Sequence, residues 1–194
     1  DAAVYPHGLN ARQFRLRSTH SRSDATLARA DTALAPPRAK PIGRDEFTRR
    51  RRQLMKAMGR DSIAILPAAP VRLRNNDVEY AYRQDSDFHY VTGFPEPEAV
   101  AVFVPGREQG EFVLFVRDRD PTRETWDGRR AGPEGATRDF GADDAFPVGD
   151  IDEILPGLME NQARVYYAMG THPEFDQRVV GWVNGLRTQA RDGR

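Results

Sequence analysis

Cysteine is absent from this 194-residue chain, and histidine occurs only four times. Without thiols the chain can form no disulfide, no thiolate zinc or iron–sulfur site, and no cysteine nucleophile. The histidines are not spaced as a metal-binding pair on a helix or strand; they are His7, His20, His89 and His172. The commonest sulfur and imidazole metal centres are therefore excluded.

Net charge is also missing, because 29 Lys and Arg residues balance 29 Asp and Glu residues. The chain as a whole creates no field that would attract nucleic acid or an anionic membrane. The longest apolar runs, residues 99–105 and 112–116, are far shorter than the roughly 20 residues that span a bilayer. We therefore expect a soluble, cytoplasmic protein with no nucleic-acid or membrane partner.

Apolar residues are scarce in the first 42 positions, which are rich in Ala, Arg, Ser and Thr and end in a proline-rich stretch. Such a segment cannot bury enough apolar surface to offset its ordering entropy. Asp24 and Asp31 argue against an organellar transit peptide. We expect a flexible tail over residues 1–42 and one domain over residues 43–194.

Helical periodicity marks residues 44–58, with Gly59 as the stop signal. The apolar residues on one face are Phe47, Leu54, Met55 and Met58. Four consecutive arginines, 49–52, sweep around such a helix, so we interpret them as a solvated outer face rather than a nucleic-acid patch. Residues 151–160 and 174–187 also have helical spacing, and Pro156 should kink or divide the first of these.

Short runs rich in β-branched and aromatic residues predict strands. These runs are residues 62–67, 88–92, 98–105, 111–117 and 165–169. The glycine-containing loop 106–110 should join its flanking strands as an antiparallel hairpin. Continuous apolar character in residues 62–67 and 98–105 indicates strands covered on both faces. We predict an α/β domain with a mixed β-sheet and helices packed on it.

One carboxylate and histidine cluster could suggest a metal site. Asp85, Asp87 and His89 alternate, and on a strand they would share one face. A lone strand histidine is more often structural, so we expect no metal there. The sequence also has no phosphate-binding glycine loop, serine-hydrolase elbow or zinc-protease motif. The residues by themselves thus indicate no self-contained catalytic constellation.

Residues 75–132 carry a more specific pattern. Its elements are Asp77-x-Glu79-Tyr80-x-Tyr82-Arg83-Gln84, Ser86-Asp87-Phe88-x-Tyr90-x-Thr92-Gly93-Phe94, Glu96-Pro97-Glu98-Ala99 and Trp126-x-Gly128-Arg129-Arg130-x-Gly132. Together with the opening Glu46-Phe47-x-Arg49-Arg50-Arg51, this pattern resembles the amino-terminal domain of Xaa-Pro aminopeptidase, or aminopeptidase P. The resemblance covers residues 44 to about 190 and leaves the tail without a counterpart.

The resemblance implies a fold and a division of labour between two domains. The amino-terminal domain of that family is related to those of creatinase and prolidase, has a ribonuclease H-like α/β fold, and is not catalytic. The family's carboxy-terminal pita-bread domain binds two metal ions, usually manganese, through two Asp, one His and two Glu. That domain is absent here, so the resemblance implies no catalytic residue, metal ligand or cofactor in this chain.

The resemblance also assigns Trp126 and Asp77 as substrate-binding residues. In the family, the amino-terminal domain helps oligomers assemble and reaches toward a neighbouring subunit's active site. The tryptophan matching Trp126 is an apolar wall near the substrate, and the acid matching Asp77 lies at the same cleft. An indole can cover a proline ring, and a carboxylate can pair with a partner's arginine. The alternatives are a core tryptophan and a turn-capping aspartate.

The implied function is that of the non-catalytic amino-terminal domain of a manganese-dependent Xaa-Pro aminopeptidase, which removes the first residue of peptides with proline second. Its expected partners are its own catalytic domain, neighbouring subunits of a homo-oligomer, and proline-containing peptides. The alternative is an assembly or binding module of a prolidase- or creatinase-like protein without peptidase activity. A reading frame that continues past Arg194 with the metal-ligand set would distinguish the two.

Overall fold

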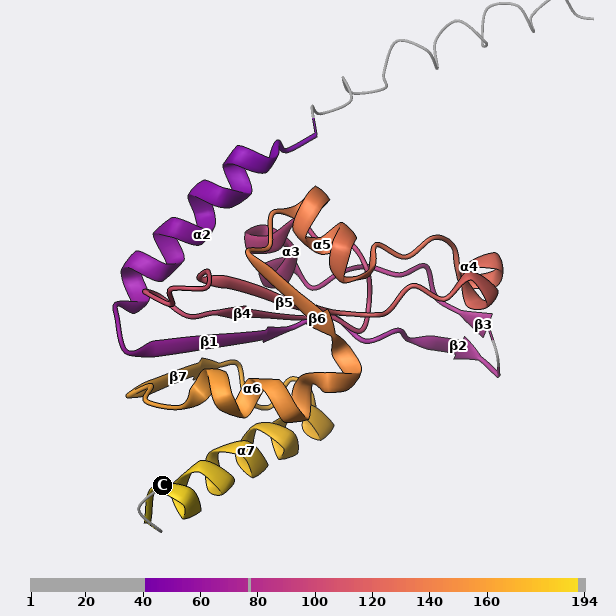
Figure 1. The fold of residues 1–194 in the computed structure, drawn as a ribbon. Helices are drawn as coiled ribbons and strands as arrows, with labels where there is room; N and C mark the ends of the chain where they lie inside the picture. The colour runs from indigo at the N-terminus through magenta and orange to yellow at the C-terminus, as the bar shows by residue number, and fades with distance from the viewer. Residues whose placement is uncertain (1–40, 77, 192–194) are drawn as a thin grey trace, which may run out of the picture. The chain divides into compact units, whose positions relative to one another are not determined.

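A five-stranded mixed sheet forms the centre of the structure, a computed structural model that describes residues 41–76 and 78–191 (Figure 1). The strand order is β6-β5-β4-β1-β7. The strands are β1 (Ser62–Pro67), β4 (Val100–Phe103), β5 (Phe112–Val116), β6 (Asp144–Pro147) and β7 (Arg164–Tyr167). β4 pairs antiparallel with β1 and β5, whereas β7 and β6 pair parallel with their neighbours. The predicted mixed sheet and its central hairpin are confirmed.

Helices cover both faces of this sheet (Figure 1). On one face lie α2 (Arg44–Met58), α3 (Ser86–Thr92) and α5 (Gly132–Phe140), and on the other lie α6 (Ile151–Met159) and α7 (Pro173–Arg191). A 3-10 turn, Val148–Asp150, leads into α6. The prediction that helices pack on both faces is confirmed.

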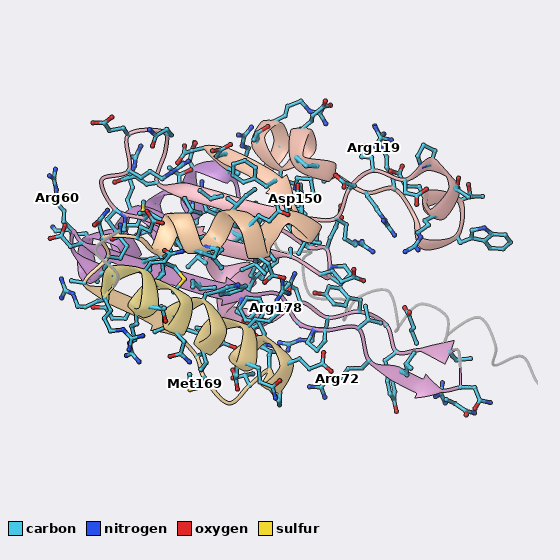
Figure 2. All side chains as sticks on the ribbon, turned by 60° about the horizontal axis from the view of Figure 1, so that its bottom comes forward. Arg60, Arg72, Arg119, Asp150, Met169 and Arg178 are labelled. Atoms are coloured by element: carbon cyan, nitrogen blue, oxygen red, sulfur yellow. The ribbon has the colours of Figure 1, made fainter. Side chains whose placement is uncertain are left out.

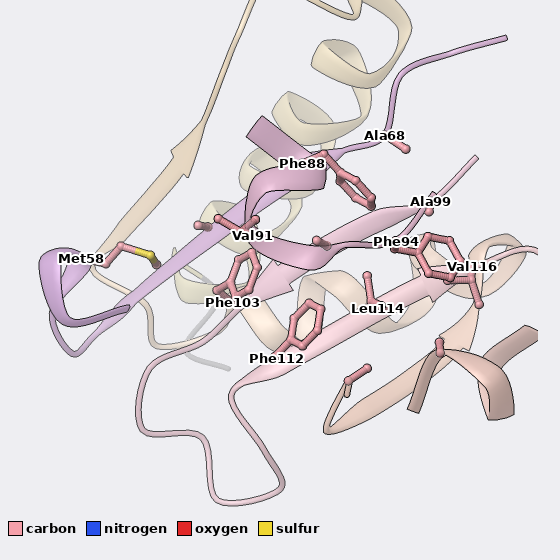
Figure 3. Close-up of a cluster of buried hydrophobic side chains, with 14 residues drawn as sticks. Met58, Ala68, Phe88, Val91, Phe94, Ala99, Phe103, Phe112, Leu114 and Val116 are labelled. Atoms are coloured by element: carbon pink, nitrogen blue, oxygen red, sulfur yellow. The ribbon is translucent and has the colours of Figure 1, made fainter. Parts of the chain in front are cut away.

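The alternation of side chains along each strand creates two separate cores. In β5, Phe112 and Leu114 enter the core under α2, α3 and α5, while Val113 and Phe115 enter the core under α6 and α7. Figure 3 shows the first cluster. The pairing register sets Phe103 of β4 opposite Phe112, and their rings stack with centroids 5.1 Å apart. Both faces of the central strands are therefore dry.

Helix α2 has the predicted bounds and is capped by Gly59, but the interpretation of its arginines as a solvated face is wrong for Arg50, whose side chain is 13% exposed, and for Arg51. Arg51 is only 5% exposed. Its guanidinium lies 4.4 Å from the Phe112 ring centroid and donates to the Val91 carbonyl at 3.3 Å. Burial lowers the pKa of Arg51 from its usual range. The residue lies four positions after Phe47, on the core-facing side, and its long apolar stem packs there.

The strand predicted over residues 88–92 is wrong, because these residues belong to helix α3. Asp85 is the N-cap, and its side chain accepts hydrogen bonds from the backbone N–H groups of Asp87 at 3.0 Å and Phe88 at 2.9 Å. Gly93 ends the helix in the left-handed conformation. Capping at both ends outweighs the β propensity of the sequence between them.

The remaining differences concern elements that periodicity did not reveal. The helices α4 (Pro121–Asp127) and α5, the strand β6, and the small pair β2 (Leu73–Asn75) and β3 (Val78–Glu79) were not expected. Pro156 does not divide α6, which is one helix. The predicted terminal helix is confirmed as α7, where the Trp182 indole donates a 2.9 Å hydrogen bond to Asp152 of α6.

Two expectations concern residues at the limits of the structure. The flexible tail was predicted over residues 1–42, of which residues 1–40 lie outside the described part. From Ile42 onward the chain forms a compact unit. Within residues 41–76 and 78–191, no helix is both long and apolar enough to cross a membrane.

Candidate functional site

Two arms extend from the same end of the sheet (Figures 1 and 2). The hairpin arm, residues 69–84, carries the antiparallel pair β2 and β3. The α4 arm, residues 117–131, leaves β5 and returns to the sheet through α5. Both arms expose large apolar side chains; these are Leu73, Val78 and Tyr80 on the hairpin arm and Trp126 on the α4 arm.

Local signals form the short helix of the α4 arm. Asp120 is its N-cap, and one carboxylate oxygen accepts from the backbone N–H groups of Thr122 and Arg123 at 3.0 and 3.2 Å. Pro121 occupies the first turn, where its missing N–H costs nothing. Gly128, with φ of 84°, follows the last helical residue. The Asp-Pro pair and the glycine were readable signals for this helix.

Trp126, the substrate-binding candidate on this arm, is 87% exposed. The alternative that it is a core tryptophan of this chain is therefore wrong. The opposite case is Arg130, which is buried and donates to the Asp118 carbonyl at 3.4 Å across the base of the arm. The arm thus buries Arg130 while it exposes Trp126, which is the reverse of what solvation favours for these two side chains.

An ion pair within the α4 arm holds its helix against the preceding segment. The Arg119 guanidinium donates two hydrogen bonds, each 3.1 Å long, to the two carboxylate oxygens of Glu124. These bonds lower the pKa of Glu124 from its usual range. Because Glu124 lies two residues before Trp126, the bidentate contact restricts the helix that carries the indole. Figure 2 labels Arg119 at this position.

The base of the α4 arm is held by Glu96, in the loop between α3 and β4. One carboxylate oxygen accepts from the backbone N–H of Ala131 at 2.7 Å, and the other lies 3.5 Å from the Arg117 guanidinium. The Glu96 and Arg117 side chains are 15% and 14% exposed. Glu96 therefore contacts both ends of the arm. The sequence pattern includes Glu96, but we assigned it no role.

The base of the hairpin arm is held in the same way by Gln84. Its side-chain oxygen accepts from the Ala69 backbone N–H at 2.9 Å and lies 2.9 Å from the Tyr82 hydroxyl. That hydroxyl also lies 3.0 Å from the Ala69 carbonyl. Burial raises the pKa of Tyr82 to about 12. Asp77, the second substrate-binding candidate, belongs to this arm but lies outside the described residues.

Neither a metal centre nor the groove beside α2 coincides with the arms in the part of the chain that the structure describes. Residues 41–76 and 78–191 contain no group of three or more His, Cys, Asp and Glu residues that could hold a metal ion. Asp85 is occupied as a helix cap, and the strand alternation that suggested a metal site does not exist. A groove of about 860 Å³ lies between α2, α3, β1 and the segment after β7, and Trp126 does not line it.

The sequence matches one protein family over most of this unit. The family model described as the N-terminal domain of aminopeptidase P matches residues 47–166. The Xaa-Pro aminopeptidase of Escherichia coli is 42% identical over 151 residues, which cover 77% of this chain and 34% of that protein. The Xaa-Pro aminopeptidase of Haemophilus influenzae is 34% identical over 138 residues, which cover 71% of this chain and 32% of that protein.

Solved structures give the same result. The aminopeptidase of Pseudomonas aeruginosa is 61% identical, with a TM-score of 0.77, over 80% of this chain and 35% of that chain. The low-pH form of Escherichia coli aminopeptidase P is 41% identical, with a TM-score of 0.75, over 79% of this chain and 35% of that chain. The chain spans about a third of the length of these relatives. It belongs to the family of aminopeptidase P N-terminal domains.

Proposed function

We propose that residues 43–194 are the non-catalytic amino-terminal domain of a manganese-dependent Xaa-Pro aminopeptidase, and that residues 1–42 are a flexible tail. The similar proteins carry the name Xaa-Pro aminopeptidase, and about two thirds of their length lies outside the match. We assign the catalytic domain to that part, where bound manganese supplies an activated water for peptide hydrolysis.

The exposed indole of Trp126 is the observation that carries this proposal. A proline ring is compact and apolar, and an indole can cover it with a large rigid surface. Exposure on an arm at the end of the sheet suits an indole that reaches a neighbouring subunit of a homo-oligomer. Asp77 of the hairpin arm would pair with an arginine at the same cleft. The proposed partners are the catalytic domain, the neighbouring subunits and proline-containing peptides. The proposed location is the cytoplasm.

The proposal is tested on the product of the complete reading frame, with a peptide that has proline second. Trp126→Ala should lower kcat/KM about 30-fold, because a buried interface tryptophan typically contributes about 2 kcal/mol. Tyr90→Ala is the matched control, since Tyr90 is an exposed aromatic residue of α3, outside both arms. Sedimentation of both variants shows whether the oligomer is retained.

Three results would contradict the proposal. A reading frame that ends at Arg194 would show that the protein has no catalytic domain. Failure of the complete product to release the first residue in the presence of manganese would contradict the proposed activity. Equal kcat/KM values for Trp126→Ala and Tyr90→Ala would contradict the proposed contact between Trp126 and the substrate.

A further inference from the structure

Gln84 and Glu96 link the bases of the two arms to each other. The Gln84 side-chain amide donates to the Glu96 carbonyl at 2.8 Å and to the Phe94 carbonyl at 3.3 Å. Its oxygen contacts both ends of the hairpin arm, while the Glu96 carboxylate contacts both ends of the α4 arm. The two arms are separate in sequence, yet their bases meet at adjacent hydrogen-bonding groups.

We propose that Gln84 and Glu96 form a positioning hub, which fixes the hairpin arm and the α4 arm relative to each other. The hub presents Trp126 and the hairpin to one substrate, so this role rests on the proposed function. Gln84 and Glu96 do not touch the substrate themselves. They act through the arms, because each contacts two residues at the base of its arm.

The side-chain chemistry at both positions suits this role. A carboxylate accepts hydrogen bonds at both oxygens, and Glu96 uses one for Ala131 and the other for Arg117. An amide accepts at one atom and donates at the other, and Gln84 uses both atoms. In Glu96→Gln, either orientation of the new amide would direct an NH₂ group at a donor. One end of the α4 arm would then lose its anchor.

The Tyr82 hydroxyl completes the hub on the hairpin side. It is 2.9 Å from the Gln84 oxygen and 3.0 Å from the Ala69 carbonyl, so its single proton can serve either acceptor. Burial raises the pKa of Tyr82 to about 12, and the hydroxyl therefore keeps this proton throughout the neutral range. The hairpin anchor is consequently insensitive to pH near neutrality.

The mobility of the α4 arm tests the hub directly on this chain. Because the chain has no cysteine, Trp126→Cys gives a single site for a nitroxide spin label. Adding Glu96→Gln to this labelled variant should narrow the lines of its electron paramagnetic resonance spectrum, because the α4 arm would move more freely. Glu46→Gln is the matched control, because it removes a glutamate paired with Arg49 and Arg50 on α2. Equal spectra for Glu96→Gln and Glu46→Gln would overturn the hub.

A second measurement needs no substitution and therefore does not depend on how a variant folds. The Ala131 backbone N–H donates to Glu96 at 2.7 Å, so its hydrogen exchange should be slow. Exchange of the Ala131 amide at the rate of an unstructured peptide would overturn the hub. Protection comparable to that of the β4 amides would support it.

Kinetics of the complete reading-frame product connect the hub to the substrate. Glu96→Gln should lower kcat/KM by about 10-fold and by no more than the roughly 30-fold expected for Trp126→Ala, because displacing the indole cannot cost more than removing it. Because Glu96 acts through Trp126, the double variant with Trp126→Ala should be no slower than Trp126→Ala alone. Independent, multiplicative losses would overturn the assignment of Glu96 as a positioning residue.

The two proposals fail in different ways. If the label at position 126 becomes mobile in Glu96→Gln and kcat/KM is unchanged, the hub stands and the substrate role of the arm fails. If kcat/KM falls while the label and the Ala131 exchange rate are unchanged, the hub fails and the substrate role stands.

Discussion

The sheet and the arms are built by different physical means. In the sheet, alternate side chains of β5 enter two dry cores, and the burial of apolar surface holds the element in place. In the arms, the large apolar residues face outward, and helix caps, one bidentate ion pair and the contacts of Gln84 and Glu96 define the geometry. Exposed large apolar side chains on both arms are typical of a surface that contacts another molecule.

Truncation in the sheet should have the largest effect. Phe103 is fully buried and stacks on Phe112, so Phe103→Ala should lower the free energy of unfolding by about 3–5 kcal/mol. Denaturant unfolding of the chain, followed by circular dichroism, measures this loss. A loss below about 1 kcal/mol would mean that the sheet is not held by its cores, and the contrast with the arms would disappear.

Asp85 and Asp120 are both helix N-caps, one in the sheet region and one in the α4 arm, so removing each cap compares the two regions. Asp85→Ala should lower the free energy of unfolding by about 1 kcal/mol, because α3 carries Phe88 into the core. Asp120→Ala removes the same kind of cap from α4 but should fray only the arm, leaving global unfolding within about 0.5 kcal/mol. Equal global losses for the two variants would show that the arm unfolds together with the sheet.

Trp126→Ala should have the smallest effect on stability. The indole is 87% exposed, so the free energy of unfolding should change by no more than about 0.5 kcal/mol. Trp182→Ala is the internal reference, since Trp182 is 8% exposed and its loss should cost about 3–5 kcal/mol. A loss at position 126 that approaches the loss at position 182 would assign Trp126 to a core.

A null result is expected for catalysis by the chain alone. Because the proposal assigns the catalytic domain to the part of the relatives that lies outside the match, we expect no manganese binding and no hydrolysis of Xaa-Pro peptides by the 194-residue chain. Calorimetric titration with manganese and a peptide-release assay measure both. Manganese-dependent release by a preparation free of other peptidases would show that an arm or another part of this chain carries catalysis.

The elements that burial specifies were the ones that the sequence predicted best. Strand β1 has its predicted bounds because a short, continuous apolar run that ends at a proline is typical of a strand buried on both faces. Residues 88–92 were misjudged because aromatic and β-branched residues favour strands, while the deciding groups, Asp85 and Gly93, lie outside that window. Arg51 was readable in principle, since it shares a helical face with Phe47 and Met58.

The arms were predicted less completely, for a different reason. The family resemblance singled out Trp126 as a candidate, and its polar neighbours in sequence argued against a core position. The hub could not be predicted, because Glu96 is 21 residues from Arg117 and 35 residues from Ala131. Helix and strand periodicity relates only residues that are close in sequence, so it cannot predict contacts between residues 21 or 35 positions apart. The Asp-Pro signal at the start of α4 is local, and a search for helix caps would have found it.

The contrast between the two tryptophans also gives the chain an internal optical reporter. Trp126 is exposed to water, whereas Trp182 is enclosed by α6 and α7 and donates to Asp152. Emission from an indole in water lies at longer wavelength than emission from a buried one, and a soluble quencher reaches only the former. A ligand that covers the α4 arm would therefore shift the long-wavelength emission of Trp126 and leave the short-wavelength emission of Trp182 unchanged. Binding of the ligand can thus be measured without a label.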